Sequence, residues 1–163
     1  TVSYELARYI KAGLKLHPSP PTELSRRPII TYTESRGKEE ALRNYKAHPN
    51  SVLIASSMDR GVDLPGDLCT VQIVAKIPFP NMKDKRINAR MFSVGGTAWY
   101  RIQAIRSLIQ MCGRGMRSVD DKCVTYILDA QFKTNLWKSD HLFPDWYKEA
   151  VSFRVSKRML GLK

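Results

Sequence analysis

The residues best suited to chemistry lie in a stretch rich in glutamine and arginine, at positions 98–118. At about 100° per residue, the angular step of a helix, five of its polar side chains fall within about 40° of one line. These five are Gln103, Arg106, Gln110, Arg114 and Arg117. The planar fork of a guanidinium group matches the oxygens of a phosphate, so Arg114, Arg117 and Gln110 could bind a multiply charged anion. Such groups also stabilise the charge that develops on a phosphoryl group during its transfer.

The opposite side of the same stretch is apolar, which predicts an amphipathic helix. Its apolar residues are Ala104, Ile105, Leu108, Met111 and Cys112. Gly113 and Gly115 each cost a helix about 1 kcal/mol relative to alanine, so we expect the helix to end in a loosened turn whose backbone can approach a ligand. Arg101 would point toward the apolar side, and we therefore expect the regular helix to begin just after it. A solvated basic helix face is the alternative interpretation.

A second candidate site is the segment SSMDRGVDLPGD, at positions 56–67. Gly61 permits a tight turn with exposed backbone N–H groups, and Asp63 could accept hydrogen bonds from vicinal hydroxyls such as those of a ribose. Ser56 and Ser57 follow an apolar run and could bind a phosphate through hydroxyl and amide groups. Taken alone, the segment could also consist of ordinary turns.

The elements that must position these residues alternate between strands and helices. Short apolar runs predict strands at 28–32, 51–55, 71–77 and 123–129. Amphipathic patterns predict helices at 3–15, at 37–47 and from Pro144 onward, where the apolar side consists of Trp146, Tyr147, Ala150 and Val151. Near-continuous apolar strands favour a parallel sheet covered on both faces. Since ligands bind at the carboxyl ends of such strands, the loops after the first two strands should meet at one edge.

The chain is strongly basic, with 27 lysines and arginines against 15 acidic residues, a formal charge of +12 and a pI near 9.8. This excess favours a polyanionic partner, although a basic surface kept for solubility is the alternative. The 163 residues suit one domain, and no apolar run is long enough to span a membrane. Cys69, Cys112 and Cys123 are far apart in sequence and the histidines form no metal-binding set, so we expect reduced thiols and no metal site.

Taken in order, these segments resemble the second RecA-like domain of superfamily 2 DNA helicases, and specifically the DinG/XPD-like group. The GVD sequence at 61–63 is similar to motif V of that family, and QxxGRxxR at 110–117 is similar to motif VI. The resemblance runs from Ser3 to Phe132. It implies an α/β fold, namely a three-layer RecA-like domain with a mostly parallel central sheet and helices on both faces.

The resemblance also implies roles for individual residues. Arg114 and Arg117 would reach the γ-phosphate of ATP, with Gln110 beside them as the third catalytic residue. The nucleotide-binding residues would be Gly61, Asp63 and Gly113. The residues that grip the phosphates of the tracked DNA strand would be Thr33, Ser35, Arg36 and Ser57. Arg60 departs from the family pattern, in which glutamate usually precedes GVD.

Neither a GxxxxGK[ST] sequence nor a DEAH-type box occurs in the chain. ATP and Mg²⁺ would therefore be bound mainly by an N-terminal P-loop domain of the same protein, which this chain lacks. Residues 1–163 would form a single second RecA-like domain, as a fragment of a longer chain. Within it we expect a surface excursion at 78–97 and a basic tail at 154–163.

The function implied by the resemblance is that of the second motor domain of an ATP-dependent DNA helicase, a class with roles in DNA repair. The domain would supply arginine fingers to ATP, grip single-stranded or forked DNA and translocate 5′ to 3′. The fragment alone would not hydrolyse ATP. The protein would be intracellular, and cytoplasmic if prokaryotic or viral. A non-catalytic basic nucleic-acid-binding or interaction module that retains the helicase fold is the alternative.

Overall fold

A computed structural model describes residues 3–16, 26–32, 34–48, 50–56, 62, 64, 66–116 and 118–153. The helices and helical turns in these ranges are α1 (Tyr4–Leu16), η1 (Ser35–Gly37), α3 (Lys38–Ala47), η2 (Gly66–Cys69), α4 (Lys85–Met91), α5 (Gly96–Cys112), η3 (Gly113–Gly115), η4 (Phe132–Leu136), η5 (Trp137–Leu142) and α6 (Asp145–Ala150). The strands are β1 (Ile29–Thr31), β2 (Val52–Ile54), β3 (Val71–Val74) and β4 (Val124–Ile127). None of the helices in these ranges is both long enough and apolar enough to cross a bilayer.

All four strands lie within the predicted runs, and all pair in parallel as expected. β1 pairs with β2, with Ile29 opposite Val52, and β3 pairs with β4, with Val71 opposite Val124. Among the described residues the strands form two separate pairs and not one continuous sheet. One central parallel sheet was expected, so the expectation and the described strands differ in this respect. Alternation of strands and helices predicts parallel pairing, but it does not determine which strands are neighbours.

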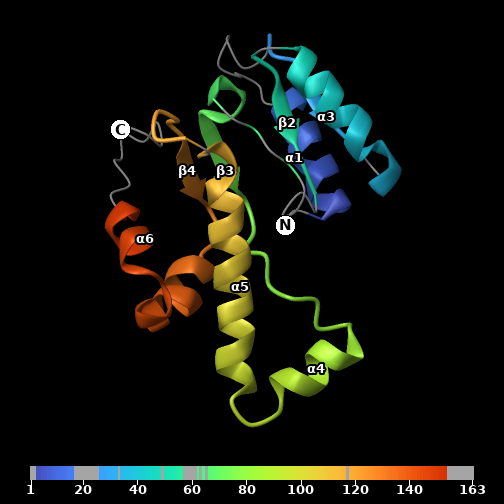
Figure 1. Ribbon diagram of the computed structural model, residues 1–163. Coiled ribbons are helices and arrows are strands. Elements are labelled where there is room, and N and C mark those ends of the chain that lie inside the picture. The colour runs from blue at the N-terminus through green and yellow to red at the C-terminus, as the bar shows by residue number, and fades with distance from the viewer. Residues whose placement is uncertain are drawn as a thin grey trace.

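α5 runs through the middle of the molecule and carries the core (Figure 1). Its predicted apolar face is confirmed, since Ala104, Ile105 and Leu108 are each no more than 2% exposed. Val74 and Ile77 pack on this face from the strand side, whereas Phe132 and Leu136 pack on it from the C-terminal helical turns. Buried apolar area in this cluster therefore fixes α5 against both the β3–β4 pair and the C-terminal turns.

The start of α5 was wrongly predicted, because the helix begins at Gly96 and includes Arg101. The guanidinium of Arg101 does point toward the packed side of the helix. Its Nε donates a hydrogen bond to Asn135 Oδ1 at 3.2 Å, and its Nη1 donates to Ser139 Oγ at 3.3 Å. A polar partner on the neighbouring helical turns thus makes a half-buried arginine compatible with a regular helix.

The other predicted helices are present. α1 begins after Ser3, whose Oγ accepts a hydrogen bond from the Leu6 N–H at 3.2 Å, as expected of an N-cap residue. α6 begins after Pro144, as predicted. Its apolar side was partly wrong, because Tyr147 is buried but Trp146 is 62% exposed. Adjacent helical residues point about 100° apart, so contact between Tyr147 and the core turns Trp146 outward.

Candidate functional site

The chain leaves β1 and β2 at the same edge of their pair. Thr31 Oγ1 donates a hydrogen bond to the Ile54 carbonyl at 3.1 Å, and the Tyr32 hydroxyl donates to the Ser56 carbonyl just beyond the two strands. The predicted meeting of the two loop starts is therefore confirmed at Tyr32 and Ser56. Among the candidate residues that follow them, Thr33, Ser57, Gly61 and Asp63 lie outside the described residues, as does Arg60.

Arg114 joins the two candidate motifs. It lies in η3, the turn that directly follows α5, so the glycines loosen the helix end as predicted. Arg114 Nη1 donates a hydrogen bond to the Val62 carbonyl at 2.6 Å, across 52 positions of sequence. The arginine of the second motif thus contacts the backbone of the 56–67 segment, in which Val62 is only 3% exposed.

Gly115 explains why the η3 turn can sit this deeply. A Cβ at this position would lie 2.5 Å from the Cys69 carbonyl oxygen and 2.7 Å from Cys123 Sγ, distances that no side chain can adopt without displacement. At Gly113, by contrast, a Cβ would meet nothing within 4 Å. Both glycines were predicted to weaken the end of the helix. The structure separates them, because Gly115 is required for packing and Gly113 leaves open backbone at the end of α5.

Asp121 forms a second link between the motifs, which the sequence analysis missed. Its Oδ1 accepts a hydrogen bond from the Gly66 N–H at 3.2 Å, and its Oδ2 accepts one from the Ser118 N–H at 2.8 Å. An aspartate in a turn often accepts backbone N–H groups, so the DDK sequence could have suggested this role. The contact holds the end of the 56–67 segment beside the chain that follows η3.

Gln72 anchors the C-terminal end of α5 to the strands. Its Nε2 donates a hydrogen bond to the Met111 carbonyl at 2.9 Å, and its Oε1 accepts one from Thr125 Oγ1 at 3.4 Å. No pattern in the sequence indicated this role, since Gln72 stands between apolar residues of the predicted strand at 71–77. The two bonds fix the last turn of α5, and with it the η3 turn, relative to β3 and β4.

Two thiols pack behind the η3 turn. Cys69 Sγ lies 3.9 Å from Cys123 Sγ, and both cysteines are free. Burial, followed by the proximity of Cys123, raises the pKa of Cys69 to about 12, so this thiol stays protonated near neutral pH. The described residues contain no group of three or more side chains able to hold a metal ion.

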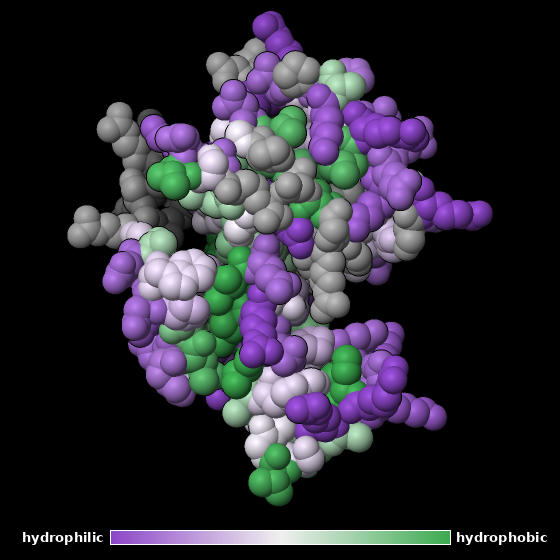
Figure 2. All heavy atoms as spheres, viewed as in Figure 1, coloured by the Kyte–Doolittle hydropathy of each residue, from purple (hydrophilic) through white to green (hydrophobic). Residues whose placement is uncertain are grey.

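The glutamine and arginine stripe predicted for α5 is only partly exposed, since Gln103 is half-buried. Arg106 and Gln110 are exposed, and Arg114 is half-buried. In Figure 2 hydrophilic atoms run beside a band of hydrophobic atoms along the middle of the molecule, where α5 lies. Arg117 lies outside the described residues. Of the other two proposed catalytic residues, Gln110 lies in the last turn of α5 and Arg114 in the η3 turn that follows it.

The proposed nucleic-acid-binding residue Arg36 lies in η1, on the surface. Its guanidinium forms an ion pair with Glu34 at 3.0 Å, and the Arg36 side chain is 91% exposed. Ser35 is the first residue of the same turn. A nearby cavity of about 350 Å³ between β1 and α3 is lined by the acidic residues Glu34 and Glu40. That cavity is poorly suited to a phosphate, whereas Arg36 itself is accessible to one.

The chain is similar in sequence to known helicases. Residues 2–150 match the family described as the helicase C-terminal domain. The chain is 33% identical over 109 residues to the ATP-dependent DNA helicase YoaA of Escherichia coli K12, an alignment that covers 63% of this chain and 17% of YoaA. It is 28% identical over 131 residues to the ATP-dependent DNA helicase XPD of Sulfolobus acidocaldarius, covering 72% of this chain and 24% of XPD.

A third relative is the ATP-dependent helicase DinG of Mycobacterium tuberculosis, which is 33% identical over 84 residues, or 48% of this chain and 13% of DinG. The chain thus spans less than a quarter of the length of each of these three relatives. The similarity lies in one segment of much longer proteins.

Proposed function

This chain belongs to the helicase C-terminal domain family, in the DinG/XPD-like group, and we propose that it is the second motor domain of an ATP-dependent DNA helicase. The observation that most supports this function is the hydrogen bond from Arg114 to the Val62 carbonyl. It places a guanidinium of the second motif directly beside the backbone of the first, where the two could act on one ligand. Residues 1–163 would form a single domain of the longer protein, including the surface excursion at 78–97 and the basic tail at 154–163.

The three-layer fold with a central parallel sheet is part of the proposal. Parallel strands are normally covered on both faces. In the β3–β4 pair one face carries exposed apolar side chains, including Val71 at 59% and Ile73 at 61%. Such a face is consistent with a pair of strands that belongs to a larger, covered sheet in the longer protein.

In the proposed reaction Arg114 and Arg117 reach the γ-phosphate of ATP, with Gln110 beside them. ATP and Mg²⁺ would be held mainly by a P-loop domain, and the metal ion would neutralise phosphate charge there. The contribution of this chain would be electrostatic, because the guanidinium groups stabilise negative charge that grows on the phosphoryl oxygens as water attacks. Arg114 would exchange the neutral Val62 carbonyl for an anionic oxygen, which is the stronger partner for a guanidinium.

The remaining proposed residues would form the nucleotide and DNA sides of the site. Gly61, Asp63 and Gly113 would contact the nucleotide, and the open backbone at Gly113 supports that role. The phosphates of single-stranded or forked DNA would be gripped by Thr33, Ser35, Arg36 and Ser57. The net charge of +12 supports a polyanionic partner. Translocation would proceed 5′ to 3′, as the family likeness suggests.

The test is DNA-stimulated ATP hydrolysis by the chain joined to its P-loop domain. Arg114→Ala should lower kcat by about 10³-fold or more, the range known for arginine fingers, whereas the nucleotide Kd should change little. Arg106→Ala is the matched control, because Arg106 is exposed on the same stripe but lies two turns before η3. An Arg114→Ala protein that hydrolyses ATP as fast as the Arg106→Ala protein would refute the finger assignment.

The non-catalytic module is the second candidate, and Arg60 leaves it open, since glutamate usually precedes GVD in the group. The same experiment separates the two functions. The chain by itself should hydrolyse no ATP under either proposal, because it has no P-loop sequence. Joined to a P-loop domain, a motor domain should give ATP hydrolysis that DNA stimulates, whereas a non-catalytic module should give none.

A further inference from the structure

α4 and the first turns of α5 form a hairpin that extends away from the strands (Figure 1). Its tip, defined here as residues 92–95, carries two solvent-exposed apolar side chains. Phe92 is 75% exposed and Val94 is fully exposed. Two large apolar side chains at an extremity of the molecule lie outside the core and outside the motor site described above, so packing within the described residues does not explain them.

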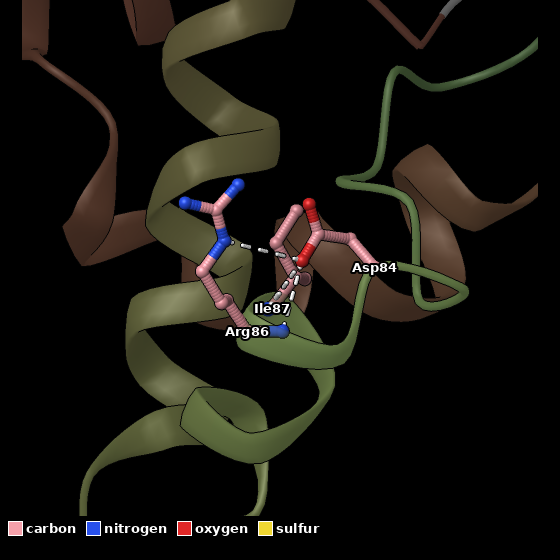
Figure 3. A network of polar contacts seen from close by, with 3 residues as sticks. All are labelled: Asp84, Arg86 and Ile87. Atoms are coloured by element: carbon pink, nitrogen blue, oxygen red, sulfur yellow. Dashed lines mark hydrogen bonds and ion pairs between the residues drawn. The ribbon is translucent and has the colours of Figure 1, made fainter.

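The tip has a defined shape. Asp84 caps α4, since its Oδ1 accepts hydrogen bonds from the N–H groups of Arg86 at 2.8 Å and of Ile87 at 3.5 Å (Figure 3). Gly95 has a φ of +73°, and a Cβ on Gly96 would lie 2.0 Å from the Arg90 carbonyl oxygen. The close approach at Gly96 holds the end of α4 directly against the start of α5.

Trp99 reinforces the hairpin from the α5 side. The guanidinium of Arg90 lies over the Trp99 ring, 4.5 Å from its centroid, and links the two helices. The Tyr100 hydroxyl donates a hydrogen bond to the Pro80 carbonyl at 2.9 Å, and its ring stacks on Phe79 at 5.5 Å. Trp99 and Tyr100 are thus engaged in packing, which leaves Phe92 as the exposed aromatic side chain of the tip.

The helices that lead to and from the apolar tip are rich in basic residues. Between positions 78 and 112 the chain has one acidic residue, Asp84, and six basic residues. The basic residues are Lys83, Lys85, Arg86, Arg90, Arg101 and Arg106. The side chain of Arg86 is 94% exposed even though it forms a 3.8 Å ion pair with Asp84. Figure 2 shows hydrophilic atoms on the α4 side of the hairpin and hydrophobic atoms at its lower end.

We propose that this tip binds the junction between duplex and single-stranded DNA, with Phe92 stacked on the last base pair and Lys85 and Arg86 on the flanking phosphates. The proposal rests on the function proposed above. A base pair at the end of a duplex is an apolar face bordered by phosphates, which is complementary to an apolar tip at one end of α4 with Lys85 and Arg86 at the other end of the same short helix. The tip offers one aromatic platform and not a row of them, which suits one exposed base-pair face better than successive bases of a single strand.

The test compares a fork with a single strand of the same sequence, using the chain joined to its P-loop domain and no nucleotide. A fluorescent base analogue at the last base pair of the fork reports stacking, and titrations give both Kd values. Phe92→Ala should weaken fork binding about tenfold and leave single-strand binding within about twofold. Tyr9→Ala is the matched control, because Tyr9 is 76% exposed on α1, and it should change neither Kd.

A second arm tests the charges. Lys85→Ala combined with Arg86→Ala should reduce the slope of log Kd against log salt by about two for the fork, because two phosphate contacts are lost. An unchanged slope would overturn the phosphate part of the proposal. A ratio of fork to single-strand Kd that Phe92→Ala leaves unchanged would overturn the stacking part.

Two further outcomes separate this proposal from others. If Phe92→Ala lowers the unfolding temperature or the DNA-free ATP hydrolysis rate, Phe92 packs against another part of the protein and the DNA assignment is wrong. If Arg114→Ala leaves ATP hydrolysis intact, the motor proposal fails. The fork preference, which is measured without nucleotide, still decides the role of the tip in that case.

Discussion

Gly115→Ala is the substitution for which the structure predicts the clearest structural effect. The new Cβ would lie 2.5 Å from the Cys69 carbonyl oxygen and 2.9 Å from Cys123 Cβ. Since real Cβ contacts are essentially never under 3.0 Å, the η3 turn and η2 must separate by about 0.5 Å or more. Backbone atoms on both sides cannot rotate away as a long side chain could. Overpacking of this kind costs about 1–3 kcal/mol, and we expect about 2 kcal/mol here.

The assay is thermal and urea unfolding of the chain. For a chain of this size, about 2 kcal/mol corresponds to a fall in Tm of roughly 6 °C. Gly113→Ala is the matched control two residues away, where φ is −74° and a Cβ has no neighbour within 4 Å. It should be neutral or should stabilise the chain by about 0.4–1 kcal/mol, because alanine restricts the unfolded state.

A third variant tests the cause of the effect. Cys123→Ala removes the sulfur that lies 2.7 Å from the new Cβ but leaves the Cys69 carbonyl in place. Combined with Gly115→Ala, it should therefore restore only part of the lost stability. Equal unfolding free energies for Gly115→Ala and Gly113→Ala would refute the reasoning, since they would show that the η3 turn does not pack on η2 in solution.

Two further predictions concern the same region. Asp121→Ala removes the acceptor for two backbone N–H groups and should lower the free energy of urea unfolding by about 1–2 kcal/mol. Asp120→Ala, at the exposed neighbouring residue, should lower it by almost nothing. Equal losses for the two variants would contradict the bridging role of Asp121. The raised pKa of Cys69 predicts that stability falls as pH rises from about 9 toward about 12, because the unfolded chain releases a thiol proton that the folded chain retains. Cys69→Ala should make this alkaline loss of stability shallower, and an unchanged pH profile from unfolding titrations would show that the thiol is not held neutral.

The sequence predicted the elements well wherever a strong period was present. The apolar face of α5 follows a 3.6-residue repeat, and Ala104, Ile105 and Leu108 are buried accordingly. The four strands were predicted from a different pattern, namely short and nearly continuous apolar runs. The stretch that contains η4 and η5 was not predicted, because the apolar residues from Phe132 to Leu142 follow no clear helical period. Phe132 and Leu136 are buried nonetheless, since they contact the face of α5.

The parts of the site that sequence could not predict are contacts between distant segments. Nothing local shows that Gly115 meets Cys69, or that Gln72 holds the last turn of α5. Arg101 was misplaced for the same reason, because its partners Asn135 and Ser139 are more than 30 positions away. Periodicity indicates which side of a helix faces inward, but it does not indicate whether the inward side carries a polar partner for an arginine.

The contact between Arg114 and Val62 links the proposed nucleotide side of the site to its proposed DNA side. Val62 is 3% exposed, so its carbonyl needs a donor, and removing one costs about 1–3 kcal/mol. If Arg114 moves to a phosphate, the 56–67 segment must rearrange to satisfy that carbonyl. The same segment begins at Ser56, which bonds Tyr32 and directly precedes the proposed DNA-binding residue Ser57 in sequence. Nucleotide binding would in this way affect the proposed DNA-binding residues through one hydrogen bond. Arg114→Ala should accordingly speed hydrogen exchange around η2 even without ATP, as well as slowing hydrolysis. Slower ATP hydrolysis with unchanged hydrogen exchange would show that the role of Arg114 in hydrolysis does not depend on its hydrogen bond to Val62.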